Sequence, residues 1–262
     1  MGNKVDLDAF ADRLSESLPG ISVDCVVFGY DSQQLHVLLL KWKYEEAWSL
    51  PGGFVHSSES LDDAAHRVLD ERTGLRSIFL QQFHTFGALG RAASGHESDY
   101  DKMRKILERM PLKGQKWDIN WFAKRFVSTA YFALVDMRRA RPHPDFLSER
   151  CEWVSLEEVP DLILDHRMML DMALQYLRRQ LQYLPIGRSL LPERFTMPEL
   201  QGLYEAILGH PLVRSNFQRK MLNLGTLIRH EKLMTGAANK APYLYSFDPV
   251  IYERLLEEGI GF

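Results

Sequence analysis

The stretch of residues 53–75 constrains the fold more than any other part of the chain. Residues 61–73 carry the signals of a helix, with aspartates in the first turn. Ser58 or Ser60 is the expected N-cap, because a serine side chain accepts a hydrogen bond from the free N–H groups at a helix start. Gly74 follows the last turn and supplies a left-handed C-cap. The stretch therefore predicts a glycine turn followed by a capped helix.

The spacing of this stretch matches the Nudix box, in which glycine, glutamate, Arg-Glu and Glu-Glu stand at fixed intervals. The chain therefore resembles the Nudix hydrolase superfamily, and the resemblance implies a Nudix-type αβα sandwich. Val68 and Arg72 depart from the pattern, because they stand where it has glutamates. The positions in register are Gly53, Glu59, Arg67, Leu69, Glu71, Gly74 and Leu75.

The two departures bear on catalysis. On a helix, positions 68, 71 and 72 share one face, so carboxylates there would converge on one hard cation. Of these three positions only 71 carries a carboxylate, and Arg72 places a positive charge beside it. Glu71 is either solvated or the ligand of a single cation. A pyrophosphatase needs metals to neutralise the diphosphate and activate water. We therefore predict a domain without catalytic residues, metal or cofactor, in which Glu59 and Arg67 pair to shape the loop before the helix.

Length and composition narrow the class of protein. A chain of 262 residues is long for one domain and favours two. The net charge of −3 excludes a basic coat over the whole surface but allows a local basic patch. Cys25 and Cys151 form neither a metal-ligand spacing nor a disulfide framework, which suits a reducing compartment. The N-terminal segment is charged and lacks an apolar run of signal or membrane length, so we expect a cytoplasmic protein.

Residues 1–184 are predicted to form the Nudix-like domain. Two apolar runs separated by a polar turn indicate a hairpin, and later apolar runs indicate further strands on either side of the box helix. This order predicts an α/β fold. The expected strands are residues 22–30, 35–42, 48–50, 78–86, 127–135 and 151–154, and the expected helices are residues 5–18, 61–73 and 165–184.

Residues 92–127 interrupt this pattern. They contain a small polar segment, a charged helix over residues 100–110, and then Trp117 and Trp121. A long segment without a strand inside a compact domain is typical of a lid or a binding loop. Two interpretations stay open: a surface insertion that covers a sheet edge, or a lid whose tryptophans close a ligand pocket.

Residues 185–262 are predicted to form a second domain. Thr196 and Glu199 make a capping box that starts a helix, and a second helix follows over residues 213–224. Residues 227–233 and 243–247 then read as two strands. A helix, a short turn, a helix and a β-hairpin predict a winged helix-turn-helix domain.

The charge of this segment points to nucleic acid. Residues 214–240 contain six Lys and Arg against one acidic residue. A basic, polar second helix followed by a basic hairpin is typical of major-groove recognition with phosphate contacts from the wing. The alternative is a winged helix that binds protein or dimerises and whose basic face is only solvated. The predicted DNA-binding residues are Arg214, Ser215, Asn216, Gln218, Arg219, Lys220, Lys232 and Lys240.

A Nudix-like domain followed by a winged helix resembles the Nudix-related transcriptional regulators. Further motifs that carry this resemblance include Thr85-Phe-Gly87, Asp165-His166 and Asn216-Phe-Gln-Arg-Lys-Met221. The resemblance implies a homodimeric repressor of palindromic double-stranded DNA operators, whose first domain senses a small effector such as ADP-ribose or a sugar.

The effector site and a rival function complete the sequence-based hypothesis. The rival is an active Nudix hydrolase of ADP-ribose or a nucleoside diphosphate derivative, with the winged helix serving only for dimerisation. A third possibility is a sensor that acts on a protein partner. The residues predicted to bind the effector are Trp48, Arg67, Glu71, Phe86, Arg91, Trp117 and Trp121.

Overall fold

The computed structural model describes residues 17–76, 78–89, 91, 99–109, 126–183, 187–234 and 241–258. The predicted helix of residues 5–18 falls almost entirely outside these ranges. Its last two positions, Ser17 and Leu18, belong to strand β1 (Ser17–Tyr30), so this part of the prediction is wrong. Pro19-Gly20 is not a helix stop. Gly20 has a φ of +76°, which allows an irregularity within the strand where the pairing register shifts.

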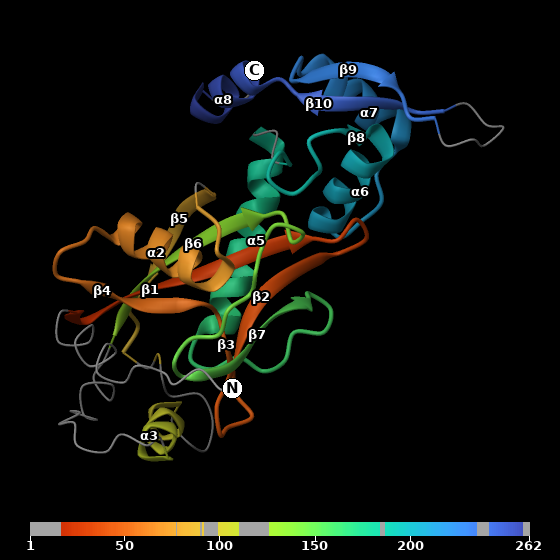
Figure 1. Cartoon of the computed structure of the whole chain (residues 1–262). Coiled ribbons are helices and arrows are strands. Elements are labelled where there is room, and N and C mark those ends of the chain that lie inside the picture. Colours follow the sequence, from red (N-terminus) through yellow and green to blue (C-terminus); the bar gives the residue numbers. More distant parts are fainter. Residues whose placement is uncertain are drawn as a thin grey trace.

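The first domain is built on a seven-stranded mixed sheet with β1 at its centre (Figure 1). β1 pairs with β6 in parallel along one edge, while all other pairings in the sheet are antiparallel. The other strands are β2 (Leu35–Trp42), β3 (Trp48–Ser49), β4 (Gly52–His56), β5 (Phe79–Phe86), β6 (Val127–Val135) and β7 (Ser148–Ser155). The predicted strands are confirmed, and β4 is a strand that we did not predict.

The opposite edge of β1 changes partner part-way along. Asp24 pairs with Gly52 of β4, whereas Phe28 pairs with Val37 of β2. Between these points the Cys25 N–H donates to the Pro51 carbonyl at 2.7 Å. The sheet therefore splits between β4 and β2, and the split opens a gap in its hydrogen-bonded surface.

Helix α2 (Leu61–Thr73) covers one face of the sheet and is confirmed over the predicted residues. Of the two candidate caps the structure selects Ser60, whose hydroxyl accepts the Asp63 N–H while the Asp63 carboxylate accepts the Ser60 N–H. Gly74 ends the helix with a φ of +67°, which favours glycine. The buried side of α2 packs on alternate residues of β1, including Cys25.

Helix α5 (His166–Tyr183) covers the other face, so the domain has the predicted αβα layers (Figure 1). Its Met169, Ala173 and Leu177 pack on Val26 and Phe28, which alternate along β1 with the residues under α2. The charged helix of the insertion is α3 (Asp99–Arg109). No helix among the described residues is long and apolar enough to span a membrane.

The second domain is a winged helix, as predicted. Helices α6 (Met197–Leu208) and α7 (Arg214–Asn223) precede the hairpin of β9 (Leu227–Lys232) and β10 (Tyr243–Phe247). Sequence analysis missed the two-residue strand β8 (Phe195–Thr196), which pairs with β10, and the last helix α8 (Pro249–Glu258). The predicted capping box of α6 is present.

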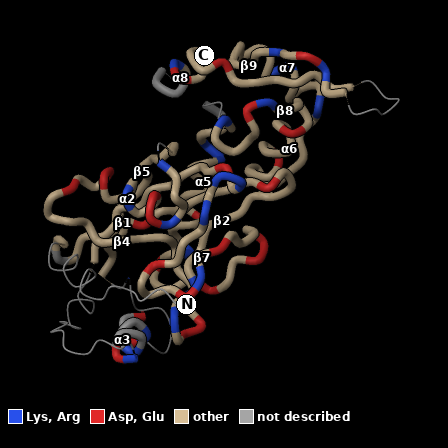
Figure 2. Tube along the Cα trace, in the orientation of Figure 1, with Lys and Arg blue, Asp and Glu red and all other residues tan. Residues whose placement is uncertain are grey.

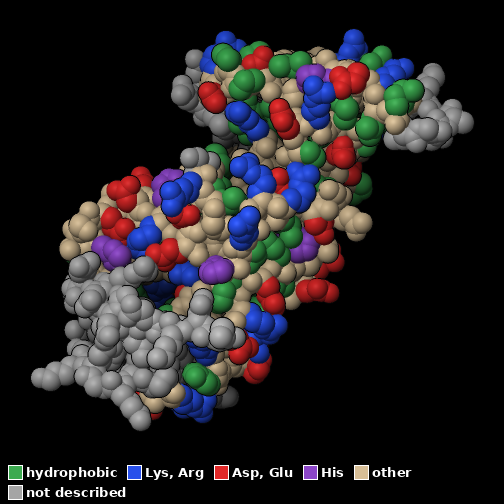
Figure 3. Space-filling model, in the orientation of Figure 1, with side chains coloured by type: hydrophobic (Ala, Val, Ile, Leu, Met, Phe, Trp, Pro, Cys, Tyr) green, Lys and Arg blue, Asp and Glu red, His purple; other side chains and the backbone are tan. Residues whose placement is uncertain are grey.

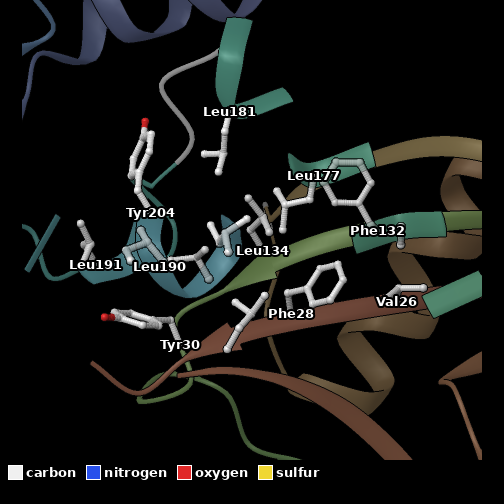
Figure 4. Packing of buried hydrophobic residues seen from close by; sticks show 14 of the residues in the cluster. Val26, Phe28, Tyr30, Phe132, Leu134, Leu177, Leu181, Leu190, Leu191 and Tyr204 are labelled. Atoms are coloured by element: carbon white, nitrogen blue, oxygen red, sulfur yellow. The ribbon is translucent and has the colours of Figure 1, made fainter. Parts of the chain in front are cut away.

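The two domains share one hydrophobic cluster. Tyr30 and Leu134 at the end of the sheet meet Leu181 of α5 and Leu191 and Tyr204 of the winged helix (Figure 4). A polar contact joins the same elements, because Arg178 Nε of α5 donates to the Ile207 carbonyl of α6 at 2.7 Å. Residues 184–186 are not described, so the domain boundary at 184/185 stays a prediction.

Candidate functional site

The split in the sheet borders a cavity of about 240 Å³. Since β1 changes partners here, the cavity is reached by side chains from both the α2 side and the α5 side. Walls that combine aromatic and apolar groups with a few charged ones are usual for a small-molecule site. The lining includes Gly53, Arg67, Glu71 and Arg72 near α2, Asp24, Leu50, Arg91 and His166 near α5, and the aromatic residues Trp42, Phe54, Phe126 and Phe146.

Glu59 and Arg67 form the predicted ion pair on the α2 side. Arg67 donates from Nε and Nη2 to the Glu59 carboxylate at 3.0 and 2.6 Å, and Nη2 also donates to the Phe54 carbonyl at 2.9 Å. Burial alone would raise the pKa of Glu59, but hydrogen bonds from Arg67 and from the His56 N–H outweigh burial and lower it. The pair ties the loop before α2 to the helix, which is a structural role.

Val68, at a position where the Nudix box has a glutamate, faces away from solvent. Its side chain is 1% exposed and packs with Cys25, Ala65 and other residues between α2 and the sheet. Gly53 allows this packing, since a Cβ atom there would lie 2.8 Å from Val68 Cγ2. The side chain is therefore part of the core.

Arg72, at the second departure from the box, reaches the cavity beside Glu71. Arg72 Nη2 donates to Glu71 Oε2 at 3.0 Å, and Arg67 Nη1 lies 3.8 Å from Glu71 Oε1. Glu71 is thus held between two guanidinium groups. Those cations oppose the binding of another cation at its carboxylate.

The Nudix fold implies divalent cations held by carboxylates of the box helix, and the residues of this chain do not fit them. Val68 is buried among apolar groups and Arg72 is a cation, so neither offers an oxygen ligand. Within the described ranges, no group of three or more His, Cys, Asp or Glu residues is arranged to hold a metal ion.

A buried polar network forms the floor of the cavity on the α5 side. Arg91 Nε donates to both Asp165 carboxylate oxygens at 2.9 and 2.8 Å, and Nη1 donates to the Phe126 carbonyl at 3.3 Å. Arg91 Nη2 lies 3.5 Å from Asp24 Oδ2, which also accepts a hydrogen bond from the Ser128 hydroxyl. Arg91 thus offsets the charge of the buried Asp24 and the mostly buried Asp165, and ties the start of α5 to β1.

His166 completes this network in its neutral form. The Leu50 N–H donates to its Nδ1 at 3.0 Å, so Nδ1 carries no proton. Its Nε2 lies 3.7 Å from Asp24 Oδ1. Burial is the largest influence and lowers the pKa of His166; Asp24 opposes the shift and Arg91 reinforces it.

Protonation of His166 should therefore destabilise the fold. The unfolded chain takes up a proton near pH 6.5, the ordinary value for histidine, whereas the folded chain does so only at lower pH. Stability from this group is fully present above pH 6.5 and is lost as the pH falls from there towards the folded pKa. His166→Gln keeps an acceptor for the Leu50 N–H and should flatten the decline of thermal stability in mild acid. His66→Gln, on the exposed face of α2, is the control, and an unchanged slope in His166→Gln would contradict this assignment.

The structure brings together only some of the predicted effector residues. Arg67, Glu71 and Arg91 line the cavity. Phe86 is instead buried in the core under α5. Trp48 packs at the edge of that core, with the Arg150 guanidinium over its ring. Neither residue lines the cavity. Trp117 and Trp121 lie outside the described residues.

Sequence analysis missed several residues that line the cavity. Asp24 is a single carboxylate within an apolar strand, which is a signal that could have been used. His166 appeared only as part of the Asp165-His166 motif and was not among the predicted effector residues. The rings of Phe54 and Phe126 pack at a tilt of 36° with 5.2 Å between their centroids, although the two residues are distant in the sequence.

Helix α7 carries six of the predicted DNA-binding residues outside its buried side. Phe217 and Met221 are buried, with Phe217 packed against Tyr204 of α6. This packing leaves Gln218 half-buried and its predicted neighbours exposed; Arg219 Nη2 donates to Asn216 Oδ1 at 3.2 Å. No side chain caps the start of α7, so its first N–H groups can meet a phosphate. The exposed predicted residues are Arg214, Ser215, Asn216, Arg219 and Lys220.

The hairpin adds positive charge next to α7 (Figure 2). Lys232 is exposed on β9 with its Nζ 5.3 Å from the centre of the Tyr243 ring. Arg229, which we did not predict, stacks over the same ring at 4.7 Å. Lys240 lies outside the described residues. On the face seen in Figure 3, Lys and Arg of this domain stand beside Asp and Glu, so the basic character is local.

Comparisons with known proteins match both domains of the chain. A family model described as the NUDIX domain matches residues 18–173, and one described as the NrtR DNA-binding winged helix domain matches residues 187–247. The chain is 32% identical over 237 residues to the "ADPR responsive transcriptional repressor NtrR" of Acinetobacter baylyi, covering 87% of this chain and 82% of that protein. The chain belongs to the NrtR family of Nudix-related transcriptional regulators.

Solved structures of this family match almost the whole fold. The crystal structure of Shewanella oneidensis NrtR aligns with a TM-score of 0.66 at 27% identity, covering 89% of this chain and 96% of that one. The same protein complexed with a 27mer DNA aligns equally well, with a TM-score of 0.66 at 26% identity and coverage of 89% and 95%. The NrtR likeness thus includes both the Nudix domain and the winged helix.

Proposed function

We propose that this protein is a transcriptional repressor that binds an operator through α7 and the β9–β10 wing and responds to ADP-ribose in the cavity of its Nudix domain. The exposed, polar and basic side of α7 carries the proposal, since an NrtR relative has been crystallised with DNA. The effector is proposed from the Acinetobacter relative, which is named as ADPR responsive. The arginines and aromatic rings of the cavity suit a ligand with a diphosphate and an adenine ring.

We further propose a cytoplasmic homodimer on an inverted-repeat operator. A two-fold symmetric protein matches a palindromic site, and its half-sites should lie about one helical turn apart or a multiple of it. Hydrolysis of ADP-ribose is the alternative activity. The burial of Val68 and the cation at Arg72 argue against hydrolysis, because metal-assisted attack on a diphosphate needs carboxylates at those positions.

The operator can be sought upstream of the protein's own gene. We expect a gel shift with full-length protein at one inverted repeat there, and ADP-ribose should change the apparent affinity, whereas a sugar without the diphosphate should not. A lack of specific binding to every upstream palindrome, with and without ADP-ribose, would overturn the proposal. Release of AMP from ADP-ribose at a catalytic rate in magnesium would favour the hydrolase.

Variants of the winged helix should separate into two kinds. Arg219→Ala removes a group expected at a base edge, so it should weaken operator binding by about 1 to 3 kcal/mol and relax preference at one position. Lys232→Ala removes a phosphate contact, so it should weaken all sequences alike and flatten the salt dependence by about one unit. Arg138→Ala, an exposed arginine of the Nudix domain, is the control. If Arg219→Ala weakened binding to all DNA sequences equally, Arg219 would not be a base-contacting residue.

A further inference from the structure

The guanidinium of Arg72 lies where the Nudix box places a metal-binding carboxylate. Its side chain is 11% exposed and lines the cavity. It is paired with the carboxylate of Glu71, the preceding residue of α2. On the other side its Nη1 lies 3.5 Å from the His143 carbonyl. The group is thus fixed at the cavity wall by contacts from two separate segments of the chain.

The charges around Arg72 need no added cation. Glu59 and Glu71 carry two negative charges, and Arg67 and Arg72 carry two positive ones, joined in a chain of contacts from 2.6 to 3.8 Å. A Nudix box with glutamates at positions 68 and 72 would instead hold an excess of negative charge that a divalent cation neutralises. Here the positive charge is part of the protein.

The donors of Arg72 are not all used. A guanidinium has five N–H donors, and Arg72 Nε is buried without a hydrogen-bond partner among the described residues. A buried donor without an acceptor is uncommon in folded proteins. Nε has almost no accessible surface, so an anionic oxygen in the cavity would be bound by Nη1 and Nη2, which within the described part of the chain contact only the His143 carbonyl and Glu71. Guanidinium groups bind phosphate oxygens strongly and with defined geometry.

We propose that Arg72 takes over the role of the metal and holds the diphosphate of the effector directly, with Glu71 and Arg67 positioning its guanidinium. This inference rests on the proposed function for the identity of the ligand. It deepens that function by assigning the diphosphate contact to Arg72 and by making the binding independent of divalent cations. The bound diphosphate then meets no metal-activated water, so it stays intact.

Calorimetric titration of the full-length protein tests this inference. ADP-ribose should bind with the same affinity, within about twofold, in magnesium and in EDTA, and it should be recovered intact. Arg72→Gln should weaken ADP-ribose about 10- to 100-fold, since a charge-assisted hydrogen bond is lost, while binding of adenosine, which has no phosphate, should not change. Arg72→Lys keeps the charge but loses the planar pair of donors, so its affinity for ADP-ribose should lie between those of the wild type and Arg72→Gln.

Arg76→Gln is the matched control, because Arg76 is 85% exposed and pairs with Asp70 away from the cavity. Thermal melting identifies any variant that fails to fold. On the wild-type protein, displacement of ADP-ribose by inorganic pyrophosphate in EDTA then tests the anion site at Arg72 without a variant. Loss of ADP-ribose affinity in EDTA, or full affinity in folded Arg72→Gln, would overturn the inference.

The two proposals fail in different ways. If ADP-ribose binds neither in magnesium nor in EDTA, while ADP or UDP-glucose binds in EDTA through Arg72, the proposed effector is wrong and the anion site stands. If no diphosphate compound binds in EDTA, the anion site is wrong, even when the operator is bound and ADP-ribose acts in magnesium.

Discussion

Val68→Glu is expected to destabilise the protein by about 3 to 5 kcal/mol and to create no magnesium site. It restores the residue of the Nudix box, but the side chain at this position is 1% exposed and is surrounded by apolar groups of α2 and the sheet. Its Cγ2 lies so close to Gly53 that a longer side chain must displace β4 or leave its carboxylate buried. The loss should appear as a lower midpoint in denaturant unfolding.

Val68→Gln separates charge from size in this experiment. It has nearly the volume of glutamate without the charge, so it should be less destabilising at neutral pH, and the difference should shrink in acid, where the introduced carboxyl is neutral. Adding Arg72→Glu to Val68→Glu should not raise magnesium affinity, contrary to what the box pattern alone suggests. A stable Val68→Glu protein that binds magnesium would mean that this position opens to the cavity.

Arg91→Met is expected to destabilise the protein by about 3 to 5 kcal/mol, because it leaves the buried Asp24 and the mostly buried Asp165 without their counter-charge. The Arg91 side chain is 5% exposed and bonds Asp165 through two hydrogen bonds. Methionine is unbranched and of similar volume, so the loss reports the charge more than the packing. Denaturant unfolding measures it.

Two further variants define the cause. Arg91→Met with Asp165→Asn should recover part of the loss, since one unpaired carboxylate is removed. Arg150→Met is the control, because Arg150 is half exposed beside Glu152 and a surface pair contributes about 0 to 1 kcal/mol. A loss in Arg91→Met no larger than in this control would show that the network does not hold α5 to the sheet.

The sequence by itself determined the elements whose signals are local. The box helix is confirmed at residues 61–73, because its N-cap, acidic first turn and terminal glycine act within a few residues. Apolar periodicity likewise predicts strands β6 and β10 and helices α6 and α7. The fold class therefore needed no knowledge of distant contacts.

Only the tertiary structure decided which side chains meet. β4 and β8 exist because a partner strand lies beside them, and glycines or a length of two residues leave no periodic pattern to detect. The network of Asp24, Arg91 and His166 joins residues up to 142 positions apart, so spacing cannot predict it. Phe86 was predicted to bind the ligand but lies in the core, since the face of a strand residue depends on which helix covers the sheet.

The box pattern likewise marked positions 68 and 72 as unusual. The packing of α2 against β4 decided that one lies in the core and the other reaches the cavity.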